Sequence, residues 1–196
     1  MRGTEISNWN LFRNGIGGYW WNQQEDAAML EKIEFVKGPA GFTGNGGEPG
    51  GVLNTVTKQP VIERIANVTA GFGSYNMVRL TADLGGSISK DHKFYYRLNA
   101  GIHDQQRAFQ FGKALRYFVC PAIRYDFTKN TSVTAEYNYM WARTMGNNDG
   151  LPSISGKLFA LPRNFAVADA KTDTLIAADN YYRIQLKHNF NNNWIR

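Results

Sequence analysis

Cysteine and histidine are scarce in this chain, and their scarcity excludes two kinds of site. Cys120 is the single cysteine among 196 residues, so the chain cannot form an internal disulfide. The three histidines, His92, His103 and His188, show no zinc-ligand spacing. No pair of acidic and basic residues is spaced for general acid–base chemistry. We therefore predict no catalytic residue, no metal site and no cofactor.

Long apolar runs are also missing, and the charge of the chain points to no particular partner. No run of about 18 apolar residues occurs, which excludes a membrane-spanning helix. A basic and apolar signal peptide is missing as well, so we expect a secreted form to begin upstream of Met1. The net charge is +6, but the basic residues are scattered instead of clustered on one face. This distribution does not favour a nucleic-acid partner.

Glycine is abundant, and it is densest between Lys37 and Lys58. Seven glycines fall between Gly38 and Gly51, so the backbone turns sharply where a side chain would clash. Ile33 to Val36 predicts a short buried strand before this loop, and Val52 to Thr57 predicts another after it. A phosphate-binding loop would need Gly-Lys-Ser/Thr at the start of a helix, and that sequence does not occur.

From Ile65 onward, apolar and polar residues alternate with a period of two. The alternation predicts six strands, at residues 65–73, 78–85, 94–103, 116–127, 132–142 and 181–190. One phase of these strands is apolar apart from His188, and the other carries charged and amide side chains. A soluble β-sandwich would turn the apolar phase inward, whereas an outer-membrane barrel would turn it outward to lipid.

The lengths of the connections favour the barrel. The links after the second, fourth and sixth predicted strands are short, whereas the fifth is followed by a long loop from Arg143 to Asn180. The short link from Ser74 to Met77 is the exception. An unpaired backbone group in hydrocarbon costs several kcal/mol, and single-chain barrels begin at about eight strands. We therefore expect the chain to be part of a longer barrel, with Trp194 to Arg196 beginning another strand.

The residues around the glycine loop resemble a known family. Met29 to Lys37 (MLEKIEFVK), then Gly-Pro, then Gly47 to Pro60 (GEPGGVLNTVTKQP) resemble the end of the plug domain of TonB-dependent outer-membrane receptors, in the siderophore-receptor branch. The resemblance implies a mostly all-β fold. Residues 1–60 would be the C-terminal part of the plug, and residues 61–196 about six antiparallel strands of an incomplete barrel of about 22 strands. Gly150 to Arg163 resembles the third extracellular loop of these receptors.

The resemblance also implies a function, which is import of a ferric siderophore across the outer membrane of a Gram-negative cell. The implied partners are the ferric siderophore, TonB of the TonB–ExbB–ExbD complex, and outer-membrane lipid. Such a receptor is not an enzyme. A cobalamin, haem or oligosaccharide receptor of the same fold, a passive outer-membrane barrel and a soluble β-sandwich remain alternatives.

Five residues are candidates for the functional site. Tyr19, Trp20 and Trp21 are candidates for ligand contact, because flat aromatic faces suit a large chelated ligand. By resemblance, Trp20 falls where a related ferric-hydroxamate receptor places an apex tyrosine. The alternative is that the three aromatic residues pack against the plug core. Arg2 and Lys37 occupy positions that the resemblance assigns to contacts between the plug and barrel carboxylates.

Overall fold

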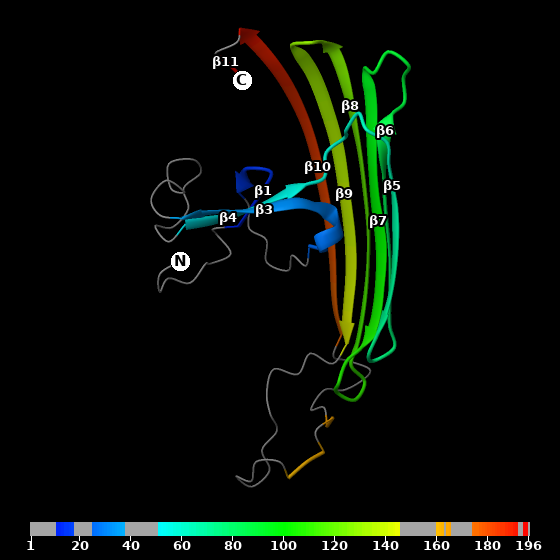
Figure 1. Ribbon diagram of the computed structural model, residues 1–196. Coiled ribbons are helices and arrows are strands. Elements are labelled where there is room, and N and C mark those ends of the chain that lie inside the picture. Colours follow the sequence, from blue (N-terminus) through cyan, green and yellow to red (C-terminus); the bar gives the residue numbers. More distant parts are fainter. Residues whose placement is uncertain are drawn as a thin grey trace. The chain divides into compact units, whose positions relative to one another are not determined.

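A computed structural model divides the chain into two compact units, Met1–Pro60 and Val61–Arg196. The structure describes residues 11–17, 25–37, 51–145, 160–162, 164–165, 174–191 and 194–195. Both units are built on β-sheets (Figure 1). In these residues the helical structure is a single 3₁₀ turn, Ala27–Met29, and no helix has the length and apolar character needed to cross a membrane.

The first unit contains a four-stranded sheet in the order β2-β1-β4-β3. Its strands are β1 (Leu11–Arg13), β2 (Ile16–Gly17), β3 (Leu30–Lys37) and β4 (Gly51–Thr57). Strands β1 and β2 form an antiparallel hairpin, β1 runs parallel to β4, and β3 runs antiparallel to β4. The two strands predicted on either side of the glycine loop are therefore confirmed. The loop itself, residues 38–50, lies outside the described residues.

Strand β3 is not buried, which corrects the prediction for its apolar core. Ile33, Phe35 and Val36 are 49%, 55% and 38% exposed. The cause is position in the sheet, because β3 is an edge strand with one neighbour, β4. Strand β4 lies between β1 and β3, and its Val52 is buried. The apolar run of four residues therefore predicted the strand correctly. It did not predict that the side chains of this strand are exposed.

The second unit is a seven-stranded antiparallel sheet in the order β11-β10-β9-β8-β7-β6-β5. All six predicted strands are confirmed, as β5 (Ile65–Gly73), β6 (Met77–Ser87), β7 (Phe94–Gln106), β8 (Lys113–Thr128), β9 (Thr131–Met145) and β10 (Thr174–Asn191). The seventh strand is β11 (Trp194–Ile195), which pairs with β10. The further strand predicted at Trp194 is therefore confirmed.

The two faces of this sheet differ in exposure in the way that the alternation predicted. The apolar phase is exposed, with Val68 at 68%, Phe72 at 79% and Ile184 at 80%. Polar members of the opposite phase are buried, and they include Arg97, Asn99, Ser132, Glu136 and Asn138. We call these the apolar face and the polar face. A soluble β-sandwich would bury the apolar face, so its exposure contradicts that alternative.

Five of the six strands are longer than predicted, and the largest difference is where β9 and β10 meet. Strand β9 continues to Met145 and β10 begins at Thr174, and these two residues pair with each other. The long connection therefore comprises residues 146–173 instead of the predicted 143–180. The antiparallel ladder depends on backbone N–H and C=O groups, so it extends past the residues whose alternation marks the strands. Figure 1 shows β9 and β10 as long, curved neighbours.

Pro121 lies inside β8 without ending it. Pro121 pairs with Leu98 of β7, while the register of β8 against β9 omits Cys120 and Pro121. Because proline has no N–H to donate, the ladder loses pairs locally and resumes at Ala122.

The connections between the strands of the second unit emerge at two ends of the sheet. At one end, named the loop end here, residues 74–76, 107–112 and 146–173 connect β5 to β6, β7 to β8 and β9 to β10. At the other end, residues 88–93, 129–130 and 192–193 make the remaining connections. The loop end is the lower end of the sheet in Figure 1.

Candidate functional site

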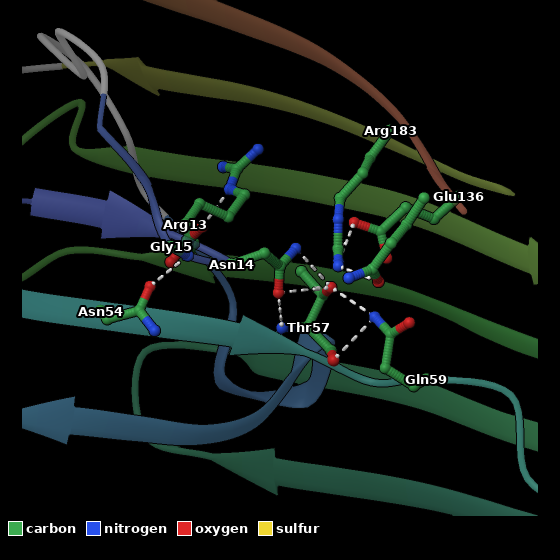
Figure 2. Close-up of polar contacts among 10 residues, drawn as sticks. Arg13, Asn14, Gly15, Asn54, Thr57, Gln59, Glu136 and Arg183 are labelled. Carbon is green, nitrogen blue, oxygen red and sulfur yellow. Dashed lines mark hydrogen bonds and ion pairs between the residues drawn. The ribbon is translucent and has the colours of Figure 1, made fainter. Parts of the chain in front are cut away.

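Polar contacts in the first unit gather around the turn between β1 and β2. Asn14 and Gly15 have φ angles of 52° and 77°, the left-handed geometry that an Asn-Gly hairpin turn uses. The Asn14 side chain accepts a hydrogen bond from Thr57 N at 3.0 Å and donates one to Thr57 Oγ1 at 2.9 Å. The Gly15 N–H donates to Asn54 Oδ1 at 2.9 Å. Figure 2 shows both amides bridging the turn to β4, so the hairpin is fixed to the middle of the sheet.

Arg13 supplies a buried charge next to this turn. Its Nε lies 2.5 Å from Glu25 Oε1, and the two side chains are 1% and 10% exposed. A charge taken out of water is tolerated when a partner of opposite sign and further hydrogen bonds compensate for lost hydration. The pair therefore ties the segment around Glu25, which precedes the 3₁₀ turn, to strand β1.

Glu34 connects β3 to the same amide. Its carboxylate accepts a hydrogen bond from Asn54 Nδ2 at 2.8 Å and lies 2.6 Å from Lys32 Nζ. The hydrogen bond from Lys32, followed by that from Asn54, lowers the pKa of Glu34. Asn54 thus uses its oxygen for Gly15 and its nitrogen for Glu34. One side chain of β4 therefore contacts both the β1–β2 turn and β3.

The polar face of the second unit carries a buried charge network on β6 and β7. Arg97 Nε and Nη2 donate to the two carboxylate oxygens of Asp83 at 2.5 and 2.7 Å, and Asn99 Nδ2 donates to Oδ1 at 2.7 Å. The Arg97 and Asp83 side chains are 7% and 15% exposed. Gly85 lies under the arginine, because a Cβ at Gly85 would be 2.7 Å from Arg97 Cδ. The bidentate geometry holds the guanidinium in one orientation.

Two further ion pairs lie on the same face. Arg183 Nη1 donates to Glu136 Oε1 at 3.3 Å, as Figure 2 shows, and Arg183 also donates to Gln185 Oε1. Arg124 Nε donates to Asp126 Oδ1 at 2.7 Å in a more exposed position. In the described part of the chain no three His, Cys, Asp or Glu residues are grouped to hold a metal ion. The ion pairs and hydrogen bonds together make the polar face a charged surface.

Comparison with known proteins shows which proteins the chain resembles. No family model matches the chain. The metal-pseudopaline receptor of Pseudomonas aeruginosa is 29% identical over 169 residues, which are 86% of this chain and 24% of that receptor. The ferrichrome outer membrane transporter/phage receptor of Escherichia coli is 28% identical over 201 residues, or 96% of this chain and 26% of that protein.

Solved structures agree in fold over almost the whole chain. FpvA of P. aeruginosa bound to a heterologous pyoverdine superposes with a TM-score of 0.88 at 22% identity, covering 99% of this chain and 27% of FpvA. The homologues and structural neighbours of the chain are TonB-dependent outer-membrane receptors. The neighbouring structures combine a plug with a β-barrel, and the fold of the chain matches part of such a structure. The predicted division into plug residues 1–60 and barrel residues 61–196 stays a prediction. The chain spans about a quarter of the length of these relatives.

One of the five predicted site residues lies in the described part of the chain. Lys37 is the last residue of β3, its side chain is exposed, and it makes no ion pair with a described residue. Arg2, Tyr19, Trp20 and Trp21 lie outside the described residues. The contacts predicted for all five residues stay predictions.

The sequence reasoning missed the polar clusters that the structure brings together. The Asn14-Gly15 dipeptide is a strong hairpin signal and would have located β1 and β2. Asp83 and Asn99 are direct partners in the register of β6 and β7. Matching opposite charges across adjacent predicted strands would therefore have found the Asp83–Arg97 pair. No comparable signal connects Arg13 with Glu25.

Proposed function

We propose that the full-length receptor containing this chain imports a ferric siderophore across the outer membrane, with energy delivered by TonB of the TonB–ExbB–ExbD complex. The proposal assigns no catalysis and no cofactor to the chain, since the ferric siderophore is the transported ligand. It assigns the apolar face of the second unit to outer-membrane lipid and the polar face to the interior of the barrel.

The division of the second sheet into two faces is the observation that carries the proposal. Val68, Phe72 and Ile184 are more than two-thirds exposed, whereas Arg97 and Glu136 on the opposite face are 6% exposed. Lipid in contact with the apolar face accounts for the exposed apolar side chains, and a hydrated lumen accounts for the charged wall. A sheet of this kind is suited to an outer-membrane barrel, which the proposed transport requires.

The class of ligand is inferred from the names of the similar proteins. The proteins that align with the chain are named for metal-pseudopaline and ferrichrome, and FpvA was solved with a pyoverdine. These names support a metal chelate over cobalamin, haem or an oligosaccharide. Two of the three comparisons cover both units of the chain almost completely. The similarity to these proteins is therefore not confined to the alternating pattern of the second unit.

Growth and binding measurements test the proposal. Deletion of the complete gene is expected to abolish growth on a ferric siderophore as sole iron source, and a plasmid copy is expected to restore it. The purified receptor is expected to bind ferric chelates and to ignore cobalamin, haem and oligosaccharides. Cells without TonB are expected to bind the chelate at the surface without importing it.

Three results would contradict the proposal. One is uptake that persists without TonB, which would indicate a passive barrel. A second is binding of cobalamin, haem or an oligosaccharide instead of ferric chelates. A third is expression that does not rise in iron-starved cells. Growth on an iron salt that needs no receptor serves as the control, because the deletion strain should grow on it normally.

A further inference from the structure

His188 interrupts the apolar face at the end of the sheet opposite the loop end. We call this end the turn end, and it is the upper end in Figure 1. Along β10, His188 lies between Leu186 and Phe190, which are 67% and 68% exposed. Its register partner on β9 is Thr131, and directly paired residues of an antiparallel sheet point to the same face. A ring with two nitrogen atoms therefore shares the surroundings of these apolar side chains.

A chain of hydrogen bonds from the turn between β8 and β9 ends at Nδ1 of His188. The Asn130 N–H donates to Thr128 Oγ1 at 3.2 Å, and the Thr128 hydroxyl donates to Thr131 Oγ1, also at 3.2 Å. Thr131 Oγ1 lies 2.8 Å from His188 Nδ1. Because the Thr131 oxygen accepts from Thr128, its own hydrogen donates to Nδ1. Nδ1 is then the acceptor of the ring, and the ring proton is on Nε2.

The Nε2–H group of His188 has no hydrogen-bond partner among the residues that the structure describes. The ring is half-buried and packs edge-on against Phe190, with ring centroids 4.5 Å apart at an angle of 77°. An unpaired N–H costs several kcal/mol inside hydrocarbon, whereas an oxygen at the edge of the hydrocarbon can accept its hydrogen bond. Nε2 therefore offers a donor to an oxygen from outside the chain.

His188 lies at one boundary of the apolar part of this face. The other boundary is Arg143 of β9, an exposed residue near the loop end whose register partners are Leu115 and Ile176. Between Thr131 and Arg143, the same face of β9 presents apolar or aromatic side chains, which are Val133, Ala135, Tyr137, Tyr139 and Trp141. At about 3.4 Å per residue this part of β9 is roughly 40 Å long, and at a tilt of about 40° it crosses roughly 30 Å, the thickness of the hydrocarbon core of a bilayer. His188 is therefore at the level where acyl chains end and headgroups begin.

The charge near His188 is positive. Lys129 lies in the turn between β8 and β9, is exposed, and makes no ion pair with a described residue. Residues 127–133 and 186–191 contain no Asp or Glu. Asp126, immediately before the first of these stretches, is held in an ion pair on the polar face. An anionic group is therefore the complement of this part of the apolar face.

We propose that His188, together with Lys129, binds the phosphate group of an anionic phospholipid in the leaflet at the turn end. The inference rests on the proposed function, which assigns the apolar face to a membrane, and it adds a specific lipid site. A phosphate oxygen accepts the hydrogen bond from Nε2, and the Lys129 ammonium balances the phosphate charge. The acyl chains of the same lipid lie against the apolar face beside Leu186 and Ile184.

Substitution of His188 in the full-length receptor tests the site. The receptor is purified in a mild detergent, phosphatidylglycerol is added, and the lipid molecules bound to each receptor are counted by native mass spectrometry. His188→Phe keeps an aromatic ring beside Phe190 but removes the donor, so binding of one phosphatidylglycerol molecule is expected to weaken about tenfold, as for loss of a hydrogen bond to a charged group. His188→Gln is expected to retain most of the affinity, because its amide N–H can donate.

Lys187→Gln is the matched control. Lys187 is the register partner of Ser132 on the polar face, and its side chain is exposed. The substitution removes a positive charge at the level of His188 but from the opposite face, so lipid binding should not change. Lys129→Gln should weaken binding of phosphatidylglycerol more than binding of phosphatidylcholine, because the phosphatidylcholine headgroup has no net charge.

The outcomes separate the lipid site from the proposed function. A His188→Phe variant that binds phosphatidylglycerol as tightly as Lys187→Gln does, or displacement of the lipid by an equal concentration of inorganic phosphate, would overturn the site while leaving siderophore import intact. A His188→Gln variant as weak as His188→Phe would also overturn it. A wild-type receptor that binds the lipid and imports no ferric chelate would contradict the proposed function alone. Equal amounts of each variant in the outer membrane establish that folding is not the cause.

Discussion

At the scale of single residues, loss of the buried Asp83–Arg97 pair should be costly. Asp83→Asn would leave the buried guanidinium of Arg97 without its carboxylate, and the two side chains are 15% and 7% exposed. Removing one partner of a buried ion pair costs about 3 kcal/mol or more, because the remaining charge stays dehydrated. Denaturant unfolding of the full-length receptor in detergent should show this loss of unfolding free energy.

Asp126→Asn is the control for that substitution. Its partner Arg124 is 41% exposed and Asp126 is 23% exposed, so water screens this pair. We expect a loss below about 1 kcal/mol, as for surface ion pairs. If the two variants lost equal stability, burial would not determine the strength of charge pairs on the polar face.

At the scale of elements, the entry into β4 depends on one glycine. Gly51 has a φ of +113°, and a Cβ there would lie 2.4 Å from the backbone oxygen of Val36. Gly51→Ala should therefore separate β3 from β4 and cost at least about 2 kcal/mol, since both the backbone strain and the contact with β3 oppose it. Faster amide hydrogen exchange in β3 and β4 would report the separation.

Gly15→Ala distinguishes strain from collision. Gly15 also has a positive φ, +77°, but a Cβ there meets no atom within 4 Å. Only the backbone strain remains, so we expect a loss of about 1 kcal/mol and little change in exchange at β3. A Gly15→Ala variant as damaging as Gly51→Ala would mean that φ alone accounts for both effects.

The strands of the second unit were predictable because their period of two is a local property of the sequence. Residues 65–73 were predicted as a strand with the bounds that β5 has. The residues around Ile33 were predicted as a strand and wrongly as buried, since burial depends on which strand lies at the edge. Likewise, the sequence did not indicate that β10 begins at Thr174, because that part of the ladder follows from pairing with β9.

The candidate site was less predictable than the fold. Arg97 and Asp83 are 14 residues apart in sequence and meet only because β6 and β7 pair in a particular register. A shift of that register by one residue would place them on opposite faces.

At the scale of the whole molecule, the apolar face determines which solvent the receptor needs. Phe72, Ile184 and Leu186 are 79%, 80% and 67% exposed. Water around such side chains would cost roughly 25 cal/mol for each Å² of apolar surface, whereas lipid hydrocarbon removes that cost. The same surface in an aqueous protein would promote association. The sheet is therefore suited to a membrane, and a charge on its apolar face should be harmful.

Val68→Arg tests this conclusion against its neighbour Thr69→Arg. Val68 is 68% exposed near the middle of β5, opposite Ala82 on the apolar face, and Thr69 is exposed on the polar face opposite Thr81. In lipid, Val68→Arg should cost about 2–4 kcal/mol in folding into liposomes, whereas Thr69→Arg should cost little. If the apolar face were in contact with water, an exposed position such as Val68 would tolerate arginine within about 0.5 kcal/mol, as surface sites do. Equal folding free energies for the two variants would therefore contradict both the membrane assignment and the proposed transport function that depends on it.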